Sequence, residues 1–96
     1  MNTYIVLGNY TDKGVAAIKN SPKRRAGVRT LLKKLGGRMK DFYLVLGGPD
    51  LVVIVELPND ETAARFALTV ASAGFVRTTT LKAFGEKDYH KIIESI

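Results

Sequence analysis

Three consecutive cations stand where the sequence predicts the start of a helix. Asn20-Ser21-Pro22 is a helix-initiation signal, because serine can cap a helix and proline suits its first turn, and Lys23-Arg24-Arg25 follows directly. Cations oppose the helix dipole at this end, but together with the free backbone N–H groups they suit a phosphate or a carboxylate. The alternative is that the charges extend into solvent, where salt screens them. The residues of this candidate anion-binding site are Lys23, Arg24, Arg25 and Arg29.

Two carboxylates could form an acid–base pair in the hairpin expected around the turn Gly47-Gly48-Pro49-Asp50. If the turn pairs its first residue with its last, Tyr43 lies opposite Ile54 and Asp41 lies opposite Glu56. Carboxylates placed in this way can share one proton and act as general acid and base. Asp41 and Glu56, with Tyr43, are therefore the candidates for catalytic residues. We favour a structural role at the strand ends, since a shift of one residue in the register separates the pair.

The composition offers little for metal or cofactor chemistry. The chain contains no cysteine, which excludes disulfides, thiolate-bound zinc and iron–sulfur clusters. His90 is the only histidine, and a single histidine makes a poor metal site. Neither a phosphate-binding glycine loop nor a Gly-x-Ser-x-Gly motif is present. We therefore expect neither a metal nor a cofactor.

The elements that would position these residues follow from the hydrophobic pattern. Alternating apolar residues predict four strands, and apolar residues at helical spacing predict two long helices between them. The expected strands are 4–10, 38–46, 51–57 and 75–84, and the expected helices are 13–19, 22–35, 58–74 and 86–96. The order β-α-β-β-α-β plus a terminal helix indicates an α+β, ferredoxin-like fold with a four-stranded antiparallel sheet. We expect residues 1–96 to form one such domain.

At least two of these strands carry apolar side chains on both faces. In 51–57, Val52 and Ile54 alternate with Val53 and Val55. An antiparallel sheet with one face in water is apolar on alternate positions only. Because the two helices cover one face, we expect a second copy of the sheet to cover the other. The residues expected at this dimer interface are Tyr4, Val6, Tyr43, Val52, Ile54 and Glu56.

Segments along nearly the whole chain resemble the GYD-domain family. They are Thr3 to Thr11, Asn20 to Arg24, Asp50 to Glu56, Ala63 to Leu68 and Val76 to Leu81. The resemblance implies a ferredoxin-like subunit that pairs sheet to sheet into a dimeric α/β barrel, and it implies little about activity. The Gly-x-Tyr-Asp turn that names the family reads Gly47-Gly48-Pro49-Asp50 here. Pro49 replaces the tyrosine, so any ligand contact through that ring is lost.

The distribution of charged residues suggests the kind of molecule that the protein binds. Ten of the 15 Lys and Arg residues lie between Lys13 and Lys40, a stretch without an acidic residue, which suggests an anionic partner.

We predict a homodimer or larger homo-oligomer that binds a small ligand, anionic if this cluster takes part, or that acts as a regulatory module. The alternatives are a cofactor-free enzyme acting on a small organic molecule and nucleic-acid binding through helix 22–35. Nucleic acid is disfavoured because strand 51–57 offers no aromatic side chain for stacking. No leader peptide or membrane span is visible, so a cytoplasmic location is expected.

Overall fold

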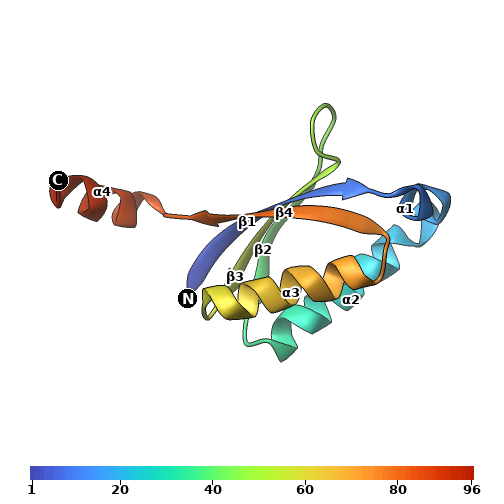
Figure 1. Cartoon of the computed structure of the whole chain (residues 1–96), viewed down its shortest axis with the longest axis horizontal. Coiled ribbons are helices and arrows are strands. Elements are labelled where there is room, and N and C mark those ends of the chain that lie inside the picture. The colour runs from blue at the N-terminus through green and yellow to red at the C-terminus, as the bar shows by residue number, and fades with distance from the viewer.

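The sheet and helices predicted from the sequence are present in the computed structural model, which covers residues 1–96 (Figure 1). The elements in chain order are β1 (Asn2–Tyr10), α1 (Asp12–Ala16), the 3-10 helix η1 (Ile18–Asn20), α2 (Ser21–Lys34), β2 (Arg38–Leu44), β3 (Leu51–Leu57), α3 (Asp60–Ser72), β4 (Val76–Ala83) and α4 (Glu86–Glu94). The strands form one antiparallel sheet in the order β2-β3-β1-β4. Helices α2 and α3 lie on the same face of this sheet. The ferredoxin-like α+β prediction is therefore confirmed.

The core lies between that face of the sheet and helices α2 and α3. Leu32 of α2 and Val55 and Leu57 of β3 have no exposed surface, and Phe66 of α3 is only 4% exposed. Around them pack half-buried residues of the same helical stripe that the sequence predicts for 22–35. The partly buried residues against the core are Val28, Leu31, Leu35, Met39, Val53 and Val70.

Local chemistry explains the start of α3 and the end of α2, but not the start of α2. Asn59 caps α3, because its side-chain oxygen accepts a hydrogen bond of 2.8 Å from the backbone N–H of Thr62. Gly36 follows α2 with a φ of 81°, the left-handed conformation that glycine commonly provides after a helix. The predicted Ser21 cap is wrong. Because η1 runs directly into α2, Ser21 is already helical and the capping position falls on Asn20, which makes no side-chain cap.

The hairpin register also differs from the predicted one. Tyr43 pairs with Val52 and Asp41 pairs with Ile54, and a bulge then places Arg38 opposite Glu56. The reason lies in Asp50, which cannot close a tight turn because it is bonded to β1. Its backbone N–H donates to the carbonyl of Gly8 at 2.9 Å, and its carboxylate accepts from the N–H of Tyr10 at 2.9 Å. The turn is therefore longer, and the N–H of Val45 donates to the carbonyl of Asp50.

The face of the sheet opposite the helices is apolar, as the sequence predicts, but its membership differs. Tyr4 and Val6, expected at a dimer interface, are 3% and 7% exposed and belong to the core beneath the helices. Since both faces of β1 are apolar, alternation could not tell which of them meets the helices. We call the opposite face the open face. Its apolar residues, adjacent in the strand register, are Ile5, Leu7, Tyr43, Val52, Ile54 and Leu81.

The last helix, α4, extends away from the sheet at the end of β4 (Figure 1). Tyr89, Ile92 and Ile93 form an apolar side of α4 that is about half exposed. None of the helices combines the length and the apolar character needed to cross a membrane.

Candidate functional site

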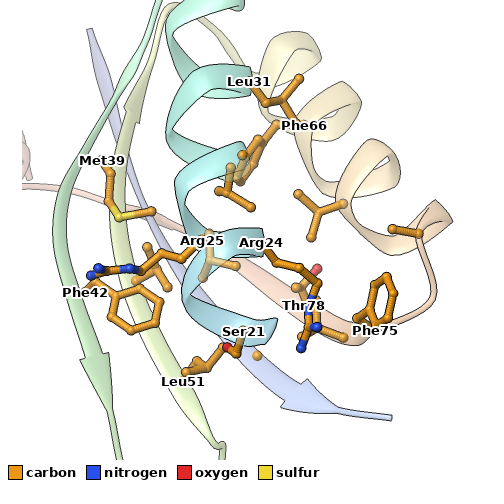
Figure 2. Close-up of a pocket in the computed structure, with 18 of the residues that line it drawn as sticks. Ser21, Arg24, Arg25, Leu31, Met39, Phe42, Leu51, Phe66, Phe75 and Thr78 are labelled. Atoms are coloured by element: carbon orange, nitrogen blue, oxygen red, sulfur yellow. The ribbon is translucent and has the colours of Figure 1, made fainter. Parts of the chain in front are cut away.

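A cavity of about 300 Å³ lies between the sheet and helices α2 and α3 (Figure 2). Its wall is mostly apolar, since 14 of the 20 residues that line it are hydrophobic. Val6 and Phe66 belong both to this wall and to the core cluster, so the cavity continues the core. Its size and composition are typical of sites that bind small molecules. Other apolar side chains of the wall are those of Val28, Leu31, Phe42, Leu51, Val53 and Val70.

Small residues leave this space open. Gly8 of β1, Gly27 of α2 and Ala67 of α3 all lie in the lining. A Cβ atom added to Gly27 would meet no other atom within 4 Å. Glycine inside a helix typically costs about 0.5–1 kcal/mol of stability relative to alanine. Gly27 therefore leaves room beside the cavity at the expense of helix stability.

One end of the cavity is cationic, because Arg24 and Arg25 of the first turn of α2 enter its lining. The Cζ atom of Arg24 lies 4.3 Å from the centre of the Phe75 ring, and that of Arg25 lies 5.1 Å from the centre of the Phe42 ring. Figure 2 shows the two arginines diverging from α2 toward these two rings. A planar guanidinium is attracted to the face of an aromatic ring. The stacking thus holds both cations in place without neutralising them.

Few other polar groups line the cavity. The hydroxyl groups of Tyr10 and Ser21 lie 3.1 Å apart and form a hydrogen bond with each other, and Thr78 is the third hydroxyl residue. Arg24 donates from Nη1 to the carbonyl of Ala17 at 3.0 Å, whereas its Nη2 is buried without a partner. No aspartate or glutamate lies in the lining. The cationic end is therefore not balanced by an acidic side chain.

The structure separates the four residues of the predicted anion-binding site. Arg24 and Arg25 line the cavity. Lys23 and Arg29 are exposed and lie outside the lining. Only two of the four cations are thus placed to act on a molecule inside the cavity, and anion binding itself stays a prediction.

The candidate catalytic residues are not brought together. Asp41, Tyr43 and Glu56 lie outside the cavity lining, and the observed register does not place the two carboxylates opposite each other. Glu56 instead forms an ion pair with Arg38 across β2 and β3. The hydrogen bond from Arg38 holds the pKa of Glu56 below its usual range. The structure brings no three His, Asp or Glu side chains together in a way that could hold a metal ion, and His90 belongs to no such group.

A second polar cluster lies at the opposite end of β1. The Tyr4 hydroxyl donates a hydrogen bond of 2.5 Å to the carboxylate of Asp60, which also lies 3.4 Å from the ammonium group of Lys82. Burial of Tyr4, and then its bond to Asp60, raise the pKa of the phenol. The same hydrogen bond lowers the pKa of Asp60. These contacts join β1, the first turn of α3 and β4, and we interpret the cluster as structural.

Sequence reasoning missed three residues that shape the cavity. Phe42 and Phe75 are two of them, because nothing in the sequence shows that an arginine of another element stacks on each ring. Gly27 is the third. A glycine inside the predicted helix 22–35 was the available signal, since it weakens a helix unless packing or function requires it.

Comparison with known proteins gives concordant matches. The family model described as "GYD domain" matches residues 4–93. A protein of Thermus thermophilus, named "Glutamine synthetase and cystathionine beta-lyase binding protein", is 39% identical over 89 residues, which are 92% of this chain and 94% of that protein. The crystal structure of TTHA0845, also from Thermus thermophilus, is similar with a TM-score of 0.56 and 27% identity, covering 88% of this chain and 94% of that one.

Proposed function

This chain belongs to the GYD domain family, and within that family we propose that it is a homo-oligomeric binding module that holds a small, mostly apolar molecule between its helices and its sheet. The observation that carries the proposal is the cavity itself. Protein interiors are close-packed, and unfilled apolar space lowers stability. Here a partly open apolar cavity of about 300 Å³ adjoins the core, and Gly27 lies in its lining although glycine weakens its helix. An apolar molecule in this space would recover contacts that the protein alone does not make.

Methyl-resolved NMR titration with octanamide, a neutral apolar probe, tests this proposal. We expect the largest shift changes at methyl groups of the lining, such as those of Val6, Leu31 and Val70, because the mostly apolar wall there suits the chain of the probe. Ala67→Leu should abolish these changes, since the larger side chain is added within the lining. Ala64→Leu is the matched control, because Ala64 lies on the same helix but is exposed and outside the lining. Shift changes confined to the open face, or equal in both variants, would refute the proposed site.

The open face supports the self-association part of the proposal. Ile5 of β1 pairs with Ile54 of β3 and with Leu81 of β4, so apolar side chains are contiguous across three strands. A contiguous apolar surface of this kind is typical of an interaction site. We expect a dimer in sedimentation velocity and a monomer for Ile54→Asp, because the new carboxylate would be buried without a partner. Leu68→Asp, on the exposed side of α3, should remain dimeric. A wild-type monomer at micromolar concentration would contradict this expectation.

The name of the Thermus relative favours a second candidate function, the binding of other proteins. We propose that a glutamine synthetase and a cystathionine beta-lyase are the partners to test, since the relative is named for binding these enzymes and is similar over 92% of this chain. Adding each purified enzyme to the same sedimentation experiment distinguishes the outcomes. Co-sedimentation with either enzyme supports protein binding, and independent sedimentation with both argues against it.

A further inference from the structure

The two arginines of the cavity are cations without an acidic partner. The lining contains Arg24 and Arg25 but no aspartate or glutamate. The ion pairs of the structure join other residues, namely Arg38 with Glu56 and Lys82 with Asp60. The half-buried charge of Arg24 is only partly solvated, so it favours a negative group on a bound molecule. The cavity therefore combines an apolar body with one end that is suited to an anion.

Arg24 and Arg25 differ in what they have free to offer. The Nη1 of the half-buried Arg24 is bonded to the carbonyl of Ala17, and its unpartnered Nη2 has almost no accessible surface. Its main contributions are therefore a fixed positive charge and support for the N-terminal turn of α2. Arg25 is exposed, stacks on Phe42, and makes no hydrogen bond or ion pair within the chain. Its N–H donors are thus available, and a carboxylate can accept two of them at once. Arg25 is the residue placed to make the direct contact.

The volume of the cavity limits how much of a ligand it can enclose. A cavity of about 300 Å³ has room for about ten non-hydrogen atoms, if each group occupies roughly the 30 Å³ of a water molecule in the liquid. The small number of other polar groups in the lining also limits the charge of the ligand. The hydrogen bond between Tyr10 and Ser21 uses one of their two hydroxyl protons, so only the other one and that of Thr78 remain for the further oxygens of a phosphate dianion. The geometry favours a single carboxylate.

We propose that the molecule bound in the cavity is an apolar monocarboxylate of about ten non-hydrogen atoms, with its carboxylate on Arg25 and its apolar body against Val28, Leu31 and Phe66. This inference rests on the proposed function and deepens it by naming the ligand class. Straight-chain and aromatic carboxylic acids of this size share the chemistry.

Octanoate and octanamide separate this inference from the proposed function, because they have the same chain and nearly the same shape but differ in charge. Measured by calorimetry or NMR titration near pH 7 and at low salt, octanoate should bind at least about tenfold more tightly than octanamide, as expected for a charge-assisted hydrogen bond. Raising the salt concentration should weaken octanoate binding and leave octanamide binding unchanged.

Two arginine variants assign the contact. Arg25→Met keeps an unbranched side chain but removes the charge, so octanoate affinity should fall to the level of octanamide while octanamide affinity persists. Arg29→Met is the matched control, one turn further along α2 and outside the lining, and should keep the preference for octanoate. The persistence of octanamide binding in Arg25→Met also shows that the cavity remains folded.

Each outcome bears on a different claim. If neither octanoate nor octanamide binds, the proposed function fails, and the inference fails with it. If both bind equally, or octylamine binds more tightly, the cavity binds apolar molecules and the carboxylate inference is wrong. Tighter binding of octyl phosphate than of octanoate would show that the cavity prefers a phosphate, and the proposed ligand class would then be wrong. Equal loss of octanoate binding in Arg25→Met and Arg29→Met would show a general effect of charge instead of a contact.

Discussion

Gly14→Ala is expected to lower the free energy of unfolding by about 3 kcal/mol, a large share of the stability of a domain of this size. Gly14 of α1 is buried, and an added Cβ atom would lie 2.1 Å from the carbonyl oxygen of Phe75. This oxygen belongs to the backbone and accepts a hydrogen bond from the N–H of Thr11, so it cannot move aside at low cost. Either α1 or the segment before β4 must shift. Urea denaturation followed by circular dichroism measures the change.

The control is the same substitution at Gly27. A methyl group there meets no atom within 4 Å, and alanine favours the helical conformation, so Gly27→Ala should stabilise the fold by about 0.5–1 kcal/mol. Gly14→Ala also displaces Phe75, on which Arg24 stacks, and should therefore disturb the cationic end of the cavity. A Gly14→Ala protein as stable as the wild type would show that the backbone around Phe75 is free to move.

The order of the elements could be predicted because it depends on local patterns. Val28, Leu31 and Leu35 recur at helical spacing and do face the core, with Leu32 fully buried beside them. Asn59, a residue type that commonly caps helices, precedes two acidic residues and does cap α3. Such signals require only neighbours in the sequence, and all of them favour the same fold.

The register and the assignment of faces could not be predicted, since they depend on contacts between distant residues. Asp50 is held by Gly8 and Tyr10 of β1, and a turn motif contains no sign of these bonds. Tyr4 and Val6 face the helices although Ile5 beside them is equally apolar. Alternation defines two faces of a strand, but packing decides which one is covered.

The candidate site could be predicted from the sequence only in part. The basic run that includes Lys23, Arg24 and Arg25 is visible in the sequence, but its members are chemically alike there. Only the fold shows that Arg24 and Arg25 meet Phe75 and Phe42 beside a cavity and that Lys23 does not. The cavity is equally hidden in the sequence, because it results from side chains that are too small to fill the space between α2, α3 and the sheet.

Phe66→Ala should have the largest effect of a side-chain truncation, because Phe66 belongs both to the core and to the cavity wall. Removing a buried phenyl ring costs about 3–5 kcal/mol, part of it for the space left behind. That space adjoins an existing cavity of about 300 Å³, so the surrounding side chains cannot move in to fill it. We therefore expect the free energy of unfolding to fall by about 4 kcal/mol. Leu68→Ala is the control on the same helix, since Leu68 is 72% exposed and should change stability by less than about 0.5 kcal/mol.

The same substitution links stability to binding. With the ring removed, the cavity becomes longer on its apolar side. The ratio of decanoate affinity to octanoate affinity should therefore be higher for Phe66→Ala than for the wild type. Because a ligand that binds only the folded state stabilises it, saturating decanoate should raise the urea midpoint of this variant. Phe66→Leu removes fewer atoms and should show intermediate behaviour if the alanine variant does not fold. A decanoate preference that is unchanged in both variants would mean that Phe66 does not limit the length of the ligand, and that the apolar body lies elsewhere.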